Sequence, residues 1–328
     1  LDGWSVPMVL RELLELYHAA HQDRAAALPA PGSYRDYLAW HGSADRNTSR
    51  AFWTSRLNGA DLPCRLNLPG GSATETADSA GEVHARILER LTAKIQTAAQ
   101  ALRVTANTLV QAAWSLALAR QADGGAEQLF GMTTAVRPGD VKGVERIVGL
   151  CTNILPRRIK LLCDLPLTEW LSELQVGQAE EQMHDRCLLS EIQGWLDLPS
   201  DQRMFESVVV FENYPTNHSI AGHEVDDPDG IRVVSFGSFE AGLDFPLCLV
   251  ISLDSCMSFR LIFGRQRFDA RVVKRLLDDV VELVLAIVAN PEQRVADLWP
   301  GQSSPLMMYR ASDNDVAGDA TPVPIPMT

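Results

Sequence analysis

Apolar residues recur every three or four positions along several stretches of the chain, the spacing that places side chains on one face of a helix. The first stretch begins at Ser5, a residue type that favours the N-cap of a helix. Its apolar positions are Val6, Val9, Leu10, Leu13, Leu14 and Tyr17. The same spacing predicts helices over 34–40, 47–57, 91–102, 107–120, 167–183 and 268–288. The 107–120 stretch is largely apolar, so we expect that helix to lie in the core.

Apolar and polar residues alternate in other stretches, which predicts strands. The clearest case is 257–263, where Met257, Phe259, Leu261 and Phe263 fall on one face. Strands are predicted over 83–88, 128–134, 153–161, 207–212, 231–236, 245–253 and 257–263. Because these strands are interspersed with helices, the pattern predicts an α/β fold with a mixed sheet.

Two stretches have the composition of linkers. Residues 58–80 are rich in Gly, Pro, Ala, Thr and Ser, which makes them the best candidate for a domain boundary. Residues 299–328 are mostly polar and proline-rich without periodicity, which predicts an interdomain linker or a disordered tail.

The overall composition is that of a large globular chain with an acidic surface. The 328 residues are 46% hydrophobic and carry a net charge of −13. No basic patch that could read phosphates is evident, so we expect no nucleic-acid partner. The longest apolar run, 280–289, contains Glu282 and is too short to cross a membrane, so we expect no membrane association.

The cysteines are scattered without a C-x-x-C pair, which predicts free thiols in a reducing cytosol. They are Cys64, Cys151, Cys163, Cys187, Cys248 and Cys256. The first residues lack the basic and apolar regions of a signal peptide, so a cytoplasmic location is expected. The chain has no P-loop, dinucleotide-binding, metal-binding or G-x-S-x-G motif, so no metal or nucleotide cofactor is expected.

The opening Leu1-Asp2-Gly3-Trp4-Ser5 resembles the second half of a His-His-x-x-x-Asp-Gly motif. That motif is found in the condensation domains of nonribosomal peptide synthetases. Further segments resemble the same family in the same order, over about residues 1–298. They are 34–40, 107–114, 130–138, 148–157, 192–195, 210–215 and 289–293. We therefore identify the chain, from its motifs, as similar to these domains.

The resemblance implies a chloramphenicol acetyltransferase-like mixed-sheet sandwich with two lobes and a tunnel at their junction. Residues 1–70 would be the tail of the N-terminal lobe, and residues 80–298 the C-terminal lobe. The implied reaction is attack of a carrier-bound aminoacyl amine on a carrier-bound acyl or peptidyl thioester. The implied partners are peptidyl or acyl carrier domains and adjacent synthetase domains. The chain would bind no cofactor itself, because the phosphopantetheine arms belong to the carrier domains.

The resemblance also implies roles for the motif residues. The catalytic histidine would precede Leu1, and none of the seven histidines in the chain has a matching context, so residues 1–328 alone are expected to form no amide. Asp2 would be a structural anchor held by an arginine. Arg137 is our candidate, since a planar bidentate donor suits a buried carboxylate. The alternatives without a functional role are an ordinary loop carboxylate for Asp2 and a surface arginine for Arg137.

Four other residues have a functional and a structural interpretation. Gly3 allows a close backbone approach near the thioester, or is an ordinary turn glycine. Trp4 lines the tunnel or packs in the core, and Ser5 faces the reaction centre or only caps the helix. Asn153 is a tunnel amide, or it satisfies backbone groups at the end of a strand.

Three other functions fit the same motifs. An epimerisation domain of this fold typically reads Asp-Gly-x-Ser-Trp, whereas here Trp4 precedes Ser5. A coenzyme A-dependent acyltransferase of the same superfamily is the second alternative. The third, of a different class, is a non-catalytic platform on which carrier proteins or tailoring enzymes dock.

Overall fold

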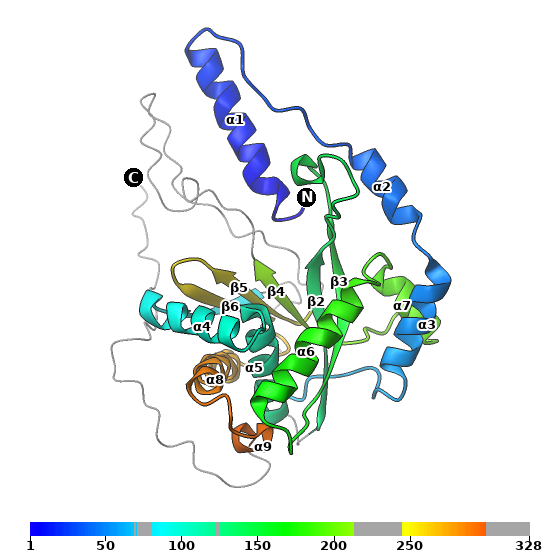
Figure 1. Ribbon diagram of the computed structural model, residues 1–328, viewed down its shortest axis with the longest axis vertical. Helices are drawn as coiled ribbons and strands as arrows, with labels where there is room; N and C mark the ends of the chain where they lie inside the picture. Colours follow the sequence, from blue (N-terminus) through cyan, green and yellow to red (C-terminus); the bar gives the residue numbers. More distant parts are fainter. Residues whose placement is uncertain (69, 71–79, 122–124, 213–244, 300–328) are drawn as a thin grey trace.

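The computed structural model describes residues 1–68, 70, 80–121, 125–212 and 245–299. Within these residues six strands form one mixed sheet in the order β1-β6-β5-β4-β2-β3 (Figure 1). The strands are β1 (Ala80–Ile87), β2 (Glu127–Ala135), β3 (Thr152–Lys160), β4 (Ser207–Glu212), β5 (Leu247–Leu253) and β6 (Met257–Gly264). β4 pairs in parallel with β2 and with β5, and the remaining neighbours are antiparallel. The predicted mixed α/β architecture is thus confirmed.

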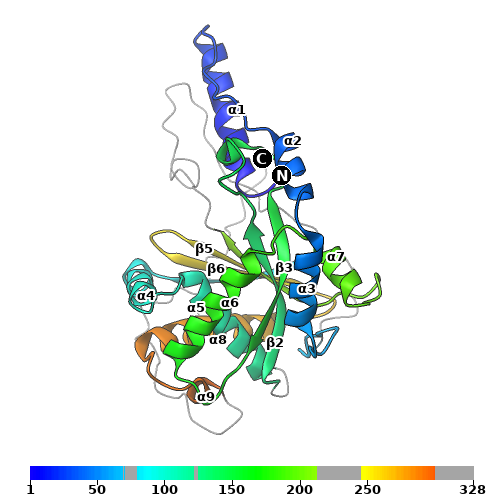
Figure 2. The same cartoon turned by 45° about the vertical axis from the view of Figure 1, so that its right-hand side comes forward.

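Helices lie on both sides of this sheet. The helices of the described residues are α1 (Ser5–His21), α2 (Tyr34–Gly42), α3 (Arg46–Leu57), α4 (Glu89–Ala101), α5 (Ala106–Gln121), α6 (Leu167–Gln182), α7 (Leu189–Trp195), α8 (Ala270–Ala289) and α9 (Val295–Leu298), with a 3-10 turn at Val144–Arg146. Figure 2 shows α6 and α3 on opposite sides of β2 and β3. The short helices α7 and α9 and the 3-10 turn were not predicted from the sequence.

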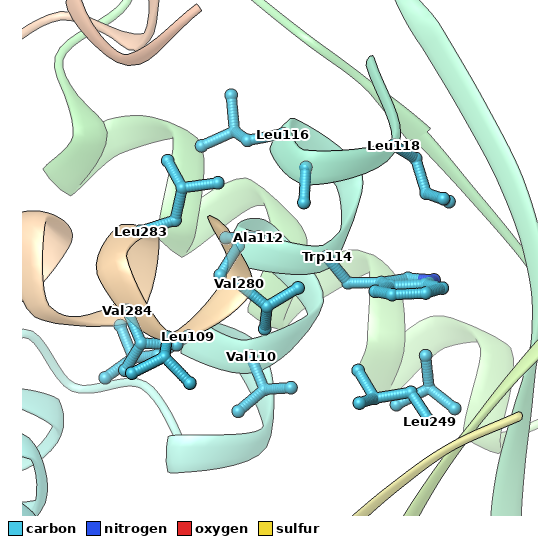
Figure 3. Close-up of a cluster of buried hydrophobic side chains, with 14 of the residues drawn as sticks. Leu109, Val110, Ala112, Trp114, Leu116, Leu118, Leu249, Val280, Leu283 and Val284 are labelled. Atoms are coloured by element: carbon cyan, nitrogen blue, oxygen red, sulfur yellow. The ribbon is translucent and has the colours of Figure 1, made fainter. Parts of the chain in front are cut away.

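The main core forms where α5 and α8 pack against the sheet (Figure 3). Every residue of α5 from Thr108 to Ala119 is buried, as its apolar composition predicted. The predicted apolar stripe of α8 is buried throughout, and Asp269 caps that helix by accepting the Arg271 N–H at 2.8 Å. Burial of each large aliphatic side chain contributes about 1.5–3 kcal/mol. These two helices therefore supply much of the driving force for folding.

A second cluster of buried side chains lies on the other side of the sheet. Trp53 and Leu57 of α3 are almost fully buried there, next to Leu129 of β2 and Ile192 of α7. The adjacent residues Val208 and Val209 of β4 belong to the second and the main cluster respectively, as strand alternation requires. Helix α3 therefore shares a core with the sheet, although it precedes the predicted linker.

Helix α1 projects away from the sheet in both views (Figures 1 and 2). The helix itself was predicted, but its apolar face is only partly covered by the described residues: Val6, Leu10 and Leu14 are half-buried. Val9, Leu13 and Tyr17 of the predicted stripe are 39%, 58% and 40% exposed, and Leu16 is 48% exposed. Few side chains of α1 are buried, among them Met8.

Some predictions lie outside the described residues: the strand 231–236, the segment 213–215 and the tail from residue 300. All six cysteines are free, and Cys151 and Cys187 are buried. Among the described residues, no helix combines the length and the apolar character needed to cross a membrane.

Candidate functional site

Asp2 and Arg137 form an ion pair between the start of the chain and the segment that follows β2. Arg137 Nη2 lies 2.9 Å from Asp2 Oδ2 and 3.1 Å from Oδ1. The side chain of Asp2 is fully buried and that of Arg137 is 7% exposed. We expected two guanidinium nitrogens of Arg137 to bind the Asp2 carboxylate. Only Nη2 does so, and Nη1 instead donates to the carbonyls of Val144 and Ile147 at 2.7 and 3.1 Å. Arg137 therefore joins Asp2 to the loop that contains the 3-10 turn.

The carboxylate of Asp2 accepts three further hydrogen bonds. Oδ1 accepts the backbone N–H of Ser5 at 2.9 Å and its hydroxyl at 2.6 Å, and Oδ2 accepts the N–H of Cys151 at 3.0 Å. Burial alone would raise the pKa of Asp2, but the bonds from Ser5 and Cys151 and the charge of Arg137 outweigh it and lower that pKa. Asp2 is thus held as a carboxylate, and it is not a proton acceptor at neutral pH.

The expected cap of α1 by Ser5 is wrong. Ser5 is the first residue of the helix, and the carboxylate of Asp2, three residues earlier, accepts the Ser5 N–H in the manner of an N-cap. Ser5 is fully buried instead, with its hydroxyl within hydrogen-bond distance of both the N–H and the carbonyl of Gly149. Of its two partners Asp2 is local, but Gly149 lies 144 residues along the chain, so local capping rules could not reveal that contact.

Gly149 sits in a close fit between Ser5 and Tyr34. A Cβ on Gly149 would lie 2.5 Å from the Tyr34 ring, which excludes any larger residue without movement of that ring. Tyr34 also donates its hydroxyl to the carbonyl of Leu150 at 3.2 Å. The segment just before β3 is therefore held by α2 on one side and by the Asp2–Ser5 motif on the other.

Trp4 and Gly3 complete the motif. Trp4 is half-buried, its indole N–H donates to the carbonyl of Glu145 at 3.1 Å, and its ring lies 5.3 Å from the guanidinium carbon of Arg137. Trp4 therefore packs over the ion pair and not in one of the buried clusters. Gly3 is half-buried in the turn between Asp2 and α1.

Asn153 does not present a free amide. Its Nδ2 donates to the carbonyls of Asp185 and Cys187 at 2.8 and 2.7 Å, and its Oδ1 accepts the N–H of Ile154 at 2.9 Å. Both amide protons are therefore used by backbone, and neither is left for a substrate. We replace the tunnel assignment of Asn153 with the strand-end alternative.

The loop 184–187, between α6 and α7, was missed by sequence reasoning. Its other carbonyls are also held by side chains: Trp53 Nε1 donates to His184 O at 3.2 Å and Arg46 Nη1 to Arg186 O at 2.6 Å. Burial raises the pKa of the Asp185 carboxyl in this loop to about 6, although the charge of Arg186 opposes the shift. Since these donors come from α3 and β3, no local pattern identifies this loop.

Two other features bear on ligands. A cavity of about 610 Å³ lies between α3, β3 and α6, where Arg56, Arg158 and Lys160 line it together with Trp170. It contains none of the motif residues at the start of the chain. Among the described residues, no group of three or more His, Cys, Asp or Glu side chains could hold a metal ion.

Comparison with known proteins gives a family match over almost the whole chain. The family model described as the condensation domain matches residues 1–303. A linear gramicidin synthase polypeptide of Brevibacillus parabrevis is 35% identical over 302 residues, which cover 91% of this chain and 6% of that protein. A chondramide synthase of Chondromyces crocatus is 32% identical over 304 residues, or 91% of this chain and 7% of that protein. The chain therefore spans only a small part of these curated relatives.

Solved structures show the same fold at lower identity. The X-domain from teicoplanin biosynthesis superimposes with a TM-score of 0.71 at 20% identity, over 90% of this chain and 68% of that chain. The first condensation domain of the calcium-dependent antibiotic synthetase, in complex with a substrate analogue, gives a TM-score of 0.69 at 20% identity, over 90% and 64%.

Proposed function

This chain belongs to the condensation domain family, and on that premise we propose that it is part of an amide-forming acyltransferase of a nonribosomal peptide synthetase. The intact enzyme joins a carrier-bound acyl or peptidyl thioester to the amine of a carrier-bound aminoacyl group. The proposal includes a two-lobed fold in which 1–70 is the tail of the N-terminal lobe, 80–298 is the C-terminal lobe, and 299–328 is an interdomain linker or a disordered tail.

The observation that carries the proposal is the environment of Asp2. Its buried carboxylate is fixed by Arg137, Ser5 and the Cys151 N–H, and its lowered pKa keeps it ionised. A group held in this way cannot serve as the base, but it can fix the backbone beside it. Amide formation needs a proton acceptor for the amine and donors for the developing oxyanion. We assign the first task to a histidine ahead of Leu1, which the anchored loop would aim.

Carrier domains are the proposed partners, and their phosphopantetheine arms bring both substrates to the site. The chain itself supplies no resident cofactor in this mechanism. We also propose a cytoplasmic location, which suits the free thiols of the six cysteines.

The proposal is tested with the full-length protein, supplied with carrier-bound acyl donors and carrier-bound aminoacyl acceptors and followed by mass spectrometry of the carrier-bound product. We expect a new amide, and a rate that falls when Arg137 is replaced by Ala but not when the exposed Arg50 is.

The same assay separates the alternatives. Inversion of the donor stereocentre without an amide would identify an epimerisation domain. Transfer from acyl-coenzyme A but not from a carrier would identify the stand-alone acyltransferase. Binding of carrier domains with no chemistry at all would identify a docking platform.

A further inference from the structure

Ser5 makes contacts that a helix-capping serine does not need. Its hydroxyl oxygen lies 2.6 Å from Asp2 Oδ1, 2.9 Å from Gly149 O and 3.0 Å from Gly149 N, and the residue is fully buried. A hydroxyl has one proton and two lone pairs. It can therefore accept the Gly149 N–H while it donates to only one of the two oxygens.

The proton is best placed on the bond to Asp2. That bond is the shorter one, and a bond to an ionised carboxylate is the stronger kind. Gly149 O is not left unpaired, because it also accepts the backbone N–H of Asp2 at 3.2 Å. Asp2 and Ser5 together thus bond to both the N–H and the carbonyl of Gly149, and they fix the register between the motif loop and the residues before β3.

We infer that Ser5 is a positioning residue for the reaction: its hydroxyl sets the Asp2 loop against Gly149 and thereby places the catalytic group that precedes Leu1. The inference rests on the proposed function, because it assigns that group to the segment next to Asp2. The hydrogen bonds that join Asp2 and Ser5 to Gly149, called the lock below, involve only described residues. They can therefore be tested apart from the chemistry.

The arrangement around Gly149 supports a positioning role over a merely structural one. Arg137 already neutralises Asp2, and the Asp2 carboxylate already accepts the Ser5 N–H, so neither the buried charge nor the helix end needs the hydroxyl. The one task that the hydroxyl alone performs is the link to the Gly149 N–H. Tyr34 closes the other side of Gly149, so this peptide has little room to shift.

The test is Ser5→Ala in the full-length protein, with Ser115→Ala as the matched control. Ser115 is equally buried, lies on α5 away from the motif, and donates one 2.8 Å hydrogen bond to Gln111 O. Both variants lose one buried hydroxyl, so both are expected to melt at slightly lower temperatures. We expect Ser5→Ala to lower kcat by about 10- to 100-fold with KM within threefold, since a small misplacement of a reacting group has effects of that size. Ser115→Ala is expected to leave both constants unchanged.

Two further readouts concern the lock directly. Amide exchange over 147–151 should accelerate in Ser5→Ala and not in Ser115→Ala, because the Gly149 N–H loses its acceptor. The acid-side loss of stability should begin at a higher pH in Ser5→Ala, because Asp2 loses one of the bonds that lower its pKa. If Ser5→Ala does not fold, the same measurements are made on Ser5→Cys, whose thiol is a weaker hydrogen-bond donor than the hydroxyl.

The outcomes are separable. An unsubstituted protein that forms no amide would overturn the proposed function, while the exchange experiment would still test the lock. An active protein whose kcat survives Ser5→Ala would overturn the positioning role, as would equal losses of kcat in Ser5→Ala and Ser115→Ala. Unchanged exchange at 147–151 would show that the lock does not exist.

Discussion

Arg137 holds Asp2 through a single guanidinium nitrogen, Nη2, which lies within 3.1 Å of both carboxylate oxygens across 135 residues of sequence. Its second terminal nitrogen is occupied by the carbonyls of Val144 and Ile147. One side chain thus neutralises a buried charge and shapes a loop at the same time. Loss of Arg137 would remove both effects.

Arg137→Ala should lower the free energy of unfolding by about 3–5 kcal/mol, because it leaves the Asp2 carboxylate buried without a counter-charge. Chemical denaturation measures the change, and Arg50→Ala on the exposed side of α3 is the control, expected to have little effect. A variant that unfolds at the denaturant concentration of the unsubstituted protein would contradict the anchor role.

The loss caused by Arg137→Ala should shrink on acidification. The folded-state pKa of Asp2 lies below its unfolded value, so its contribution is fully present above about pH 3.9 and is lost as the pH falls through the folded pKa. In the variant the uncompensated carboxylate can take up a proton and relieve its burial. Denaturation at several pH values should therefore show that the free energies of unfolding of the two proteins converge in acid.

Asn153→Ala should destabilise the protein by about 1–3 kcal/mol, since the carbonyls of Asp185 and Cys187 lose their donors. A rate effect without a change in thermal midpoint would restore the tunnel assignment that we have replaced. The control is Asn47→Ala, because Asn47 is exposed at the start of α3 and bonds to Asp45 through its backbone N–H, which the substitution keeps.

Asp185→Asn should stabilise the protein above about pH 6 and have little effect near pH 4. Burial raises the folded pKa of Asp185 to about 6, above its unfolded value of about 3.9. The contribution of the parent carboxyl is therefore fully present below the unfolded pKa and is lost as the pH rises through about 6. The uncharged amide has no such dependence. Parallel stability–pH curves for the two proteins would show that folding does not raise the pKa of Asp185.

The exposed face of α1 should make a polypeptide of residues 1–328 self-associate. Leu13, Leu16 and Tyr17 are each at least 40% exposed on one helix, and such patches mark interaction sites or aggregation. Light scattering should show oligomers that Leu13→Glu reduces, while Val176→Glu on α6, a site 56% exposed, should reduce them much less. A clean monomer that binds no apolar dye would refute this expectation.

The regular elements could be predicted because their patterns are local. The β6 alternation at 257–263 and the apolar stripe of α8 each contain the whole signal for the element that forms. The Asp2–Arg137 pair came from the family resemblance and not from periodicity. The helix α7 is only seven residues long and has too few turns to show a period.

The errors share one physical cause, which is that a polar side chain is satisfied by a distant backbone. Ser5 looks like a cap because one of its two partners, Gly149, is 144 residues away. Asn153 looks like a free amide because the carbonyls that occupy it belong to the loop before α7. Donor and acceptor types can be read from a sequence, but their pairing across the fold cannot.

The register of β1 on β6 has a consequence for synthesis of the chain. Ala80 pairs with Gly264 and Ile87 with Met257, so every other strand of the described sheet is translated before β1 can find its partner. At about 5–20 residues per second, β1 waits roughly ten seconds or longer on the ribosome with its backbone groups unpaired. An unpaired strand edge is a template for other chains. Nascent chains that pause before residue 257 should therefore be the most prone to associate with one another through the unpaired β1. Chaperones should be needed most during this interval.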